Sequence, residues 1–397
     1  MIRLSEAISA LDEWYDPRTA ESWDAVGLVC GDPADAVTGI LLAVDPVAEV
    51  AEQAERIGAQ LIVTHHPLLL DAVHSVAATT PKGALVHRLI GAGRSLFVAH
   101  TNADAADPGV SDALAARLGI QVERPLDPLP EPALDRLGVY VPADGAQALI
   151  DALAAAGAGA VGDYERCAWL VEGEGTFRPR PGAHPAVGEV GAITRLSEAR
   201  IEMAVPRGRR SAVLAALRAA HPYETPAFDL VEAIAPPSSA GLGRVGRLQA
   251  PMTLRQFAAH AARVLPGTAW GVRAGGDPDG LISTVAVCGG SGGSLIGAAQ
   301  DAGADAYLTA DLRHHVAGDA LAEAPAPDGP RAGRGPMALV DAAHWATEAP
   351  WLDQLADRLR ARFGTTVSVH VSRVVTDPWS VHFPSGAYEP EMSRSAP

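Results

Sequence analysis

The stretch 39-GILLAVDPVAEVAEQAERIGAQLIVTHHP-67 decides the fold of this chain. Its two short apolar runs, at 39–45 and 61–66, flank a segment at 47–59 in which apolar residues recur at helical spacing. A strand, a helix and a second strand in this order are typical of a βαβ unit with parallel strands. The sequence therefore predicts an α/β layer that begins here.

The same alternation continues on both sides of a central insertion. Helices are expected at 83–93 and 110–120, the second with Ser111 as its N-cap, around a strand at 95–101. The alternation resumes in the last third, with strands expected at 281–290, 305–311 and 336–345, and helices at 294–304 and 314–324. Two similar halves predict one discontinuous α/β main domain, residues 1–125 and 240–383, followed by a disordered tail at 384–397.

The insertion has a different rhythm. It begins after 125-PLDPLPEP-132, whose prolines favour a stiff, extended crossing between domains. Residues 131–235 follow the order strand, helix, strand, strand, helix, strand, which predicts a ferredoxin-like α+β domain. Within it, His221, Tyr223 and Glu224 form either a small polar site or a turn that the neighbouring prolines fix. This architecture hosts unrelated functions, so it does not say what the insertion binds.

Side chains that bind metals stand in three loops, and each loop follows an apolar, strand-like run. They are His65 and His66, Asp104, and His344 with Glu348. The carboxyl ends of strands can meet at one rim of a sheet, so these side chains can converge. A single histidine is more often a structural residue, but their combination in three strand-end loops favours a metal site.

The residue types point to two ions. His344 and Glu348 are four positions apart, which places them on one face of a helical turn. Three imidazoles and two carboxylates are too many for one open catalytic zinc, and too few to saturate two ions. Two divalent ions about 3.5 to 4 Å apart, with a bridging carboxylate and water or hydroxide, match this set. Mixed nitrogen and oxygen ligands suit Zn, Fe, Mn, Co or Ni.

Three further features have open interpretations. His100 is either an extra ligand, an orienting residue beside a ligand or a more distant support. The run GGSGGS at 289–294 either cradles a phosphate or permits close backbone packing. His315 is a candidate catalytic proton shuttle, because imidazole titrates near neutrality, and Asp311 is the residue expected to orient it.

The metal-binding segments also resemble those of a known family. Five stretches carry the resemblance: ESWDAVGL (21–28), THHPLLL (64–70), HTNADAADPGVSDALA (100–115), CGGSGGSLIGAAQDAGADAYLTADLRHH (288–315) and DAAHWATE (341–348). They are similar to segments of the GTP cyclohydrolase I type 2 homologues, also called Nif-three-like dinuclear metal centre proteins. The resemblance spans nearly the whole chain. One departure is Ala343, where the family often has glycine.

The resemblance carries several implications. It implies that His65, His66, Asp104, His344 and Glu348 are the ligands, with Glu348 as the bridge. It also implies a toroidal homohexamer, and HPYETPAFDL (221–230) resembles part of the PII-like or CutA-like insertion of the longer family members. The family label implies hydrolytic attack on the guanine ring of GTP, with loss of formate. Paired ions also serve phosphoesterases, and a non-catalytic, regulatory metal-binding scaffold is the alternative of a different class.

Composition sets the outer limits. The 397 residues are 48% hydrophobic, but no run approaches the roughly 18 to 20 apolar residues of a membrane span. The first residues carry acids where a secretory signal needs an apolar core. Three distant cysteines form no metal or redox spacing, which favours a reducing cytoplasm. The formal charge of -16 disfavours nucleic acid, so a small molecule or nucleotide is the expected partner, with no membrane.

Overall fold

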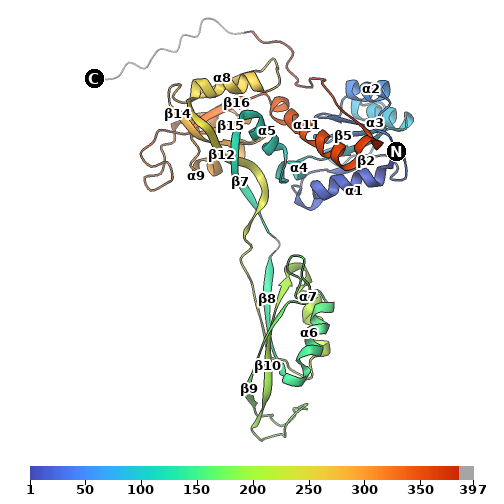
Figure 1. Cartoon of the computed structure of the whole chain (residues 1–397), viewed down its shortest axis with the longest axis vertical. Helices are drawn as coiled ribbons and strands as arrows, with labels where there is room; N and C mark the ends of the chain where they lie inside the picture. Colours follow the sequence, from blue (N-terminus) through green and yellow to red (C-terminus); the bar gives the residue numbers. More distant parts are fainter. Residues whose placement is uncertain (132, 384–397) are drawn as a thin grey trace. The chain divides into compact units, whose positions relative to one another are not determined.

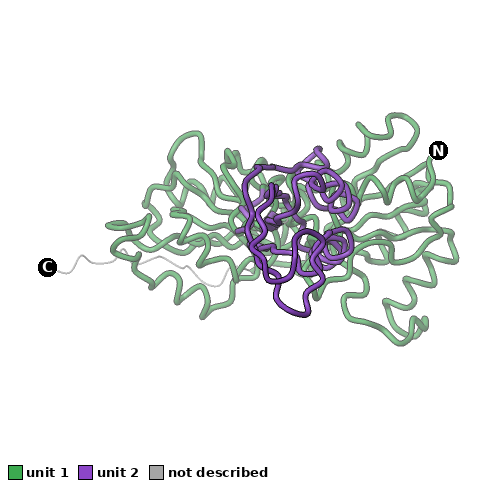
Figure 2. The backbone as a smooth tube through the Cα atoms, turned by 90° about the horizontal axis from the view of Figure 1, so that it is seen from below, with its two compact units in different colours: residues 1–129, 239–397 green, residues 130–238 purple. Residues whose placement is uncertain are grey.

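The computed structural model describes residues 1–131 and 133–383, and the tail expected to be disordered lies outside the described residues. The chain divides into two compact units (Figures 1 and 2). The main unit comprises residues 1–129 and the described part of 239–397, and the inserted unit comprises residues 130–238. No helix of the described residues is both long enough and apolar enough to cross a membrane.

The first sheet of the main unit has the βαβ segment at its centre. Its strand order is β17 (Ser368–Val371), β4 (Gly39–Ala43), β5 (Leu61–Thr64), β6 (Ser95–Val98) and β2 (Gly27–Cys30). The first four strands are parallel, and β2 is antiparallel to β6. Every residue of β4, β5 and β6 is buried, which explains their uninterrupted apolar runs, because a parallel sheet is covered on both faces. The predicted α/β class is confirmed.

Helices connect these strands. The first crossing is α2 (Ala48–Ile57), which ends at Gly58 with a φ of 71°, a left-handed conformation that glycine adopts without steric cost. The next is α3 (Pro81–Gly91), where Thr80 is the N-cap and its hydroxyl accepts the N–H of Gly83 at 3.1 Å. Helix α1 (Leu4–Trp14) places Leu4 and Leu11 in the same core as β4 and β5.

The second sheet of the main unit repeats the arrangement. Its order is β13 (Val272–Gly275), β16 (Ala338–Ala342), β15 (Ala306–Ala310), β14 (Leu281–Val287), β12 (Pro237–Thr253) and β7 (Ile120–Pro130). Strands β14, β15 and β16 are parallel, and β12 and β13 flank them in antiparallel orientation. Helices α8 (Leu254–Val264), α9 (Ile296–Asp301) and α10 (His314–Ala322) belong to this half.

Three helices lie where the two halves meet: α4 (Thr101–Ala105), α5 (Val110–Leu118) and α11 (His344–Phe363). Helix α11 follows a strand of the second sheet, yet its Trp351 and Leu355 are buried in the core of the first sheet. The expectation that Ser111 caps α5 is wrong. Gly109 is the N-cap, and the Asp112 carboxylate accepts its N–H at 2.7 Å. Ser111 is buried inside the first turn instead.

The inserted unit is a four-stranded antiparallel sheet with two helices. Its elements are β8 (Leu134–Pro142), α6 (Ala146–Ala155), β9 (Ala168–Phe177), β10 (Thr194–Pro206), α7 (Arg210–Ala220) and β11 (Phe228–Val231), and its sheet order is β11-β8-β10-β9. Along β10, Ala199 and Ile201 are buried with residues of α6 and α7, whereas Glu198 and Arg200, which alternate with them, are half-exposed. The helices therefore cover one face of this sheet.

Candidate metal centre

The two adjacent histidines lie where β5 ends. The N–H of His65 donates to Ala43 O at 3.2 Å, and that of His66 to Val44 O at 2.9 Å, so their backbone still follows the neighbouring strand. The two ring centroids are 5.1 Å apart. His65 is fully buried and His66 is partly exposed. The turn at the end of the strand therefore presents both imidazoles to one region.

Glu348 gathers the other predicted residues around these histidines. It is the fifth residue of α11, and its Oε1 is 2.9 Å from His344 Nε2, as the four-residue spacing predicts. The same oxygen is 3.5 Å from His65 Nε2, and Oε2 is 3.2 Å from His66 Nε2. Asp104, in α4, places Oδ1 3.7 Å from His65 Nε2. All five predicted side chains therefore meet at one place, although they come from three distant segments.

Each of these imidazoles is held from behind through its Nδ1 atom. Ala99 O lies 2.9 Å from His65 Nδ1, Asp45 Oδ1 lies 2.7 Å from His66 Nδ1, and Asp311 Oδ2 lies 2.7 Å from His344 Nδ1. All three neighbours are acceptors, so each Nδ1 carries the ring proton. Such contacts set the tautomer and leave Nε2 as the metal-binding atom.

His100 belongs to the same cluster. Its Nδ1 is 2.8 Å from Asp24 Oδ1, and its ring centroid is 5.1 Å from that of His65. Ligand atoms of His65, His66 and His100 lie within 4.8 Å of one another, and the same holds for His66, His344 and Glu348. His100 therefore has the position of an additional ligand rather than of a distant support.

Three atoms in the cluster are buried without a hydrogen-bond partner. They are His65 Nε2, Asp104 Oδ1 and Glu348 Oε2. Buried polar atoms in proteins are nearly always paired, because an unpaired one loses its hydration without compensation. A cation among them provides that compensation, and their nitrogen and oxygen donors suit a divalent transition metal. The residues present therefore fit the predicted kind of ion.

The charges of the cluster favour a cation as well. Burial lowers the pKa of His66, but the nearby carboxylates of Glu348 and Asp45 outweigh this effect and raise it to about 11. In the same way, burial is outweighed at His344, where Glu348 and Asp311 raise the pKa to about 10. Burial acts to raise the pKa of Glu348, yet the three imidazoles hold it well below its usual range. Without metal, protons supply positive charge to the imidazoles.

The glycine run at 289–294 packs against the ligands. Gly290 has a φ of +66°, and a Cβ atom there would lie 2.5 Å from Glu348 Oε1 and 3.2 Å from His344 Nε2. Its N–H donates to Thr347 Oγ1 at 2.9 Å, and the N–H of Gly292 donates to Thr309 Oγ1 at 2.8 Å. Because these groups are already paired within the protein, close packing explains the run better than a phosphate cradle does.

His315 lies outside both groups of ligand atoms. It is exposed on α10, next to His314, and the ring centroids of the two are 5.2 Å apart. The residue expected to orient it, Asp311, holds His344 instead. A positive φ of 56° at Asp311 turns the chain directly after β15. Asp311 therefore does not orient His315 as expected, because its carboxylate holds His344.

Two carboxylates that support the imidazoles, Asp24 and Asp45, were not predicted from the sequence, and Asp311 was predicted with His315 instead of His344 as its partner. Asp45 and Asp311 stand directly beyond β4 and β15, at strand ends like those of the ligands. Their position was therefore a usable signal. Asp24 lies in a loop before β2, where it also accepts the N–H of Thr101 at 3.0 Å. Nothing in the pattern around Asp24 indicates this role.

A cavity of about 610 Å³ adjoins the cluster. His66 and Asp45 line it together with Leu68, Leu85 and Lys82, which is the single lysine of the chain. Its volume matches that of small-molecule sites, which range from roughly 300 to 1,000 Å³. The cavity therefore gives a substrate-sized space beside one of the predicted ligands.

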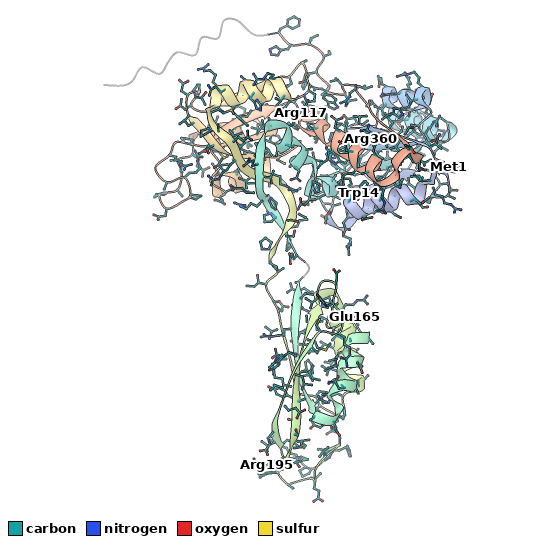
Figure 3. All side chains as sticks on the ribbon, viewed as in Figure 1. Met1, Trp14, Arg117, Glu165, Arg195 and Arg360 are labelled. Carbon is teal, nitrogen blue, oxygen red and sulfur yellow. The ribbon has the colours of Figure 1, made fainter. Side chains whose placement is uncertain are left out.

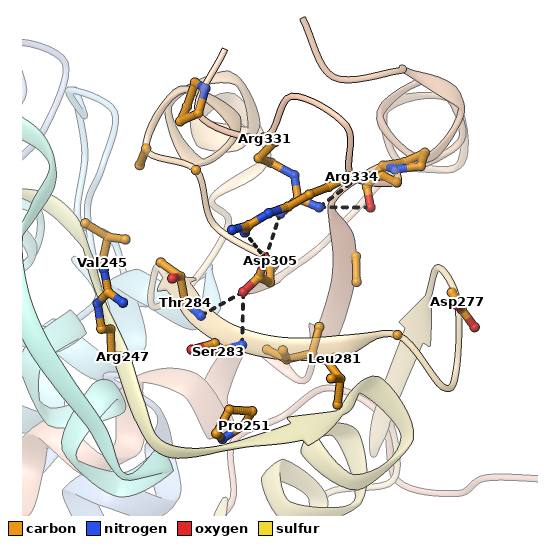
Figure 4. A pocket seen from close by; sticks show the side chains of 18 of the residues that line it. Val245, Arg247, Pro251, Asp277, Leu281, Ser283, Thr284, Asp305, Arg331 and Arg334 are labelled. Carbon is orange, nitrogen blue, oxygen red and sulfur yellow. Dashed lines mark hydrogen bonds and ion pairs between the residues drawn. The ribbon is translucent and has the colours of Figure 1, made fainter. Parts of the chain in front are cut away.

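A larger cavity of about 680 Å³ lies elsewhere in the main unit and contains none of the predicted ligands (Figure 4). At its wall, Asp305 accepts hydrogen bonds from Arg334 at 2.8 Å, Arg331 at 3.2 Å, and the N–H groups of Ser283 and Thr284 at 3.0 and 2.9 Å. These bonds tie the segment that carries the two arginines to β14. They are internal pairings with a structural role.

Comparison with known proteins places these observations in a family context. Residues 2–378 match the family model described as Duf34/NIF3 (NGG1p interacting factor 3). A Mycobacterium tuberculosis protein named "GTP cyclohydrolase 1 type 2 homolog" is 51% identical over 386 residues, which cover 97% of this chain and 98% of the relative. The crystal structure of a Bacillus cereus protein related to NIF3 is similar with a TM-score of 0.68, 32% identity, and coverage of 96% and 99%. The crystal structure of a Staphylococcus aureus protein is similar with a TM-score of 0.77 and 29% identity, and the match covers 96% of this chain and 98% of that one.

Proposed function

The chain belongs to the Duf34/NIF3 family, as the resemblance of its segments indicated, and we propose that it is a metal-dependent hydrolase with two divalent ions per subunit. His65, His66, Asp104, His344 and Glu348 are the proposed ligands. One observation carries the proposal: buried ligand atoms face one another without hydrogen-bond partners, while the opposite side of each imidazole is fixed by an acceptor.

The contacts support a division of the ligands between two ions. His66, His344 and Glu348 form one group, and His65 Nε2 lies 3.5 Å from Glu348 Oε1 and 3.7 Å from Asp104 Oδ1. Glu348 is the proposed bridge, because its two oxygens between them reach all three imidazoles. His100 is available as a further ligand, in a second group with His65 and His66.

The bound ions would supply Lewis acidity, which lowers the pKa of a bound water from roughly 15.7 to about 7. The other tasks belong to side chains of the chain itself. Asp45 and Asp311 keep the Nδ1 protons of His66 and His344 in place, so that both Nε2 atoms stay available. His315 stays a prediction for proton transfer to a leaving group, from its exposed position on α10.

The cavity beside His66 supports a substrate with an apolar or planar part and a negative charge. Leu68 and Leu85 give it apolar walls, and Lys82 offers an ammonium group near the start of α3. Arg88 also lines the cavity, but Glu52 and Glu55 pair with it. A nucleotide has both features, which agrees with attack on a nucleotide ring as the family resemblance implies. A phosphoester with an apolar group fits the same cavity.

The test begins with elemental analysis of protein purified without added metal. The loaded protein is then assayed with GTP, other nucleotides and phosphoesters, beside a Lys82→Ala variant. Formate release from GTP supports the cyclohydrolase activity, and phosphate release from esters supports the phosphoesterase. If the protein is a hydrolase that binds substrate in this cavity, the Lys82→Ala variant should have a higher KM than the wild type and the same metal content. Tight, stoichiometric metal without any turnover would instead favour the regulatory scaffold.

Further properties are proposed with the function. The strand order β11-β8-β10-β9 supports a ferredoxin-like fold for the inserted unit, which the resemblance relates to PII-like or CutA-like insertions. The family resemblance supports a toroidal homohexamer, which a mass measurement in solution tests against the 41.0 kDa chain. The free state of Cys30, Cys167 and Cys288 agrees with a reducing cytoplasm.

A further inference from the structure

The HPYET turn of the inserted unit borders a second cavity with a different chemistry. This cavity has a volume of about 450 Å³, and residues of β8, the end of β9, β10 and the turn line it. The lining residues that matter here are Tyr140, Phe177, Tyr223, Glu198 and Glu224. Glu198 lies on the face of β10 opposite to the buried residues that pack with α6 and α7. The proposed metal ligands all belong to the main unit.

His221 holds the turn rather than lining the cavity. Its Nε2 is 2.8 Å from Tyr140 O, and its Nδ1 accepts the N–H of Tyr223 at 3.0 Å. Burial lowers the pKa of His221, so the imidazole is neutral near pH 7 and adds no positive charge. His221 therefore bonds within the turn, whereas Tyr223 and Glu224 line the cavity.

Aromatic rings form part of its wall. The rings of Phe177 and Tyr223 meet edge to face, with centroids 6.0 Å apart and an angle of 62° between their planes. Nearby, the guanidinium of Arg200 lies 5.0 Å from the ring centroid of Tyr140 and donates to its hydroxyl at 2.7 Å. The negative faces of such rings attract cations. The ring of Tyr140 thus already contacts a cation of the protein itself, the guanidinium of Arg200.

The lining is also negatively charged. Glu198 Oε1 accepts the Tyr223 hydroxyl at 2.9 Å, and Glu224 is the second carboxylate. The described lining residues include no arginine, lysine or histidine. Burial, followed by the negative charges of Glu198 and Asp144, raises the pKa of Tyr223. Several negative groups therefore act on the interior of this cavity.

We propose that this cavity binds a small organic cation, with an ammonium group on a small apolar body. The carboxylates attract the charge, and the aromatic rings and the adjacent Pro179 and Ala183 contact the body. An anion would meet two carboxylates without a counter-charge. A neutral apolar molecule would remove water from Glu198 without replacing it, which costs free energy.

The experiment compares two probes of nearly equal shape on the full-length, metal-loaded protein by calorimetry. Choline carries a quaternary ammonium, and 3,3-dimethyl-1-butanol has a carbon atom in place of that nitrogen. Cation–π and ionic contacts of about 1.4 kcal/mol correspond to a tenfold change in affinity. We expect saturable choline binding that is at least about tenfold tighter than binding of the neutral alcohol.

Variants locate the site. Glu198→Gln should weaken choline binding about tenfold, and Phe177→Leu, which keeps an apolar side chain, should weaken choline more than the alcohol. Glu174→Gln is the matched control: Glu174 is on β9 and pairs with Arg195 at 2.6 Å (Arg195 is labelled in Figure 3), and it is not among the lining residues. Its choline affinity should equal that of the wild type. Absence of saturable choline binding, equal affinity for both probes, or full binding by folded Glu198→Gln overturns the proposal.

Discussion

Two buried carboxylates of the main unit, Glu348 and Asp305, differ in how completely they are paired. Glu348 follows β16, and Asp305 directly precedes β15, so they mark opposite ends of neighbouring strands in one sheet. Their exposed fractions are 2% and 9%. Asp305 accepts from two arginines and two backbone N–H groups. Glu348 keeps Oε2 without a hydrogen-bond partner, although His66 Nε2 lies 3.2 Å away, and it faces other atoms in the same state.

The difference teaches how to read a buried charge. A carboxylate whose partners are all supplied by the protein stabilises the packing of its own segment, since removing a partner leaves an uncompensated charge. A carboxylate that is equally buried but incompletely paired costs free energy unless something else binds there. Burial alone does not separate the two cases. The list of partners does.

The largest expected effect is the loss of metal from Glu348→Gln. The change removes the charge but little volume, so we expect a folded protein with at least one ion fewer per subunit. Elemental analysis and circular dichroism measure the two properties. Asp357→Asn on the same helix is the control, because its side chain is 77% exposed and pairs only with Arg360 among the ion pairs of the described residues. Full metal occupancy in Glu348→Gln would contradict a role of Glu348 in metal binding, and Glu348 would then not differ from Asp305 in function.

Asp305→Asn should act on stability instead. The amide cannot satisfy Arg331 and the backbone donors together, so the free energy of unfolding should fall by about 3 kcal/mol. Denaturant unfolding of the metal-free protein measures this change. The folded fraction should still bind the wild-type number of ions. A variant that loses metal while keeping its stability would show that the two carboxylates are not separate in function.

Asp311→Asn tests the support behind a ligand. Asparagine tolerates the positive φ of 56° at this position, so the backbone should be retained. The amide holds the Nδ1 proton of His344 less strongly than the carboxylate does, and metal affinity should fall about 10- to 100-fold. Competition with a chelator of known affinity measures it. An unchanged affinity would remove Asp311 from the supporting set.

Acidity should weaken metal binding. In the metal-free protein the pKa values of His66 and His344 are raised to about 11 and about 10, so both imidazoles carry protons near pH 7 that metal must displace. For each proton that the metal displaces, lowering the pH by one unit should reduce the metal affinity about tenfold. These raised pKa values also stabilise the metal-free fold below about pH 6.5, and that contribution is lost as pH rises through 10 and 11. Affinity independent of pH between 6 and 8 would contradict the protonation of the cluster.

Much of the candidate site was predictable, because strand ends are readable from sequence. Uninterrupted apolar runs such as 61–64 identify buried parallel strands, and the side chains directly beyond them meet at the sheet edge. The four-residue spacing of His344 and Glu348 predicts that both lie on one helical face, and the structure places them 2.9 Å apart. The six elements expected in the insertion are also observed, in the expected order.

The rest depended on contacts between distant residues. A carboxylate such as Asp24 gives no sign in its own segment that it holds His100, 76 positions away. The Ser111 cap was wrong because the helix begins earlier, with Gly109 as its N-cap and the Asp112 carboxylate accepting the Gly109 N–H. Asp311 was assigned to His315, its neighbour in sequence, but the turn after β15 directs it to His344. Local patterns identify elements, whereas partners across the fold come from packing.

The edge position of β17 has a consequence for how the protein is made. Residues 368–371 pair with β4, which is translated long before them. Until the ribosome has released them, β4 has a neighbour only on the side of β5, and its outer edge is open to pairing with other chains. A nascent or prematurely terminated polypeptide thus presents an adhesive edge, so chaperone protection should matter most until the last strand emerges.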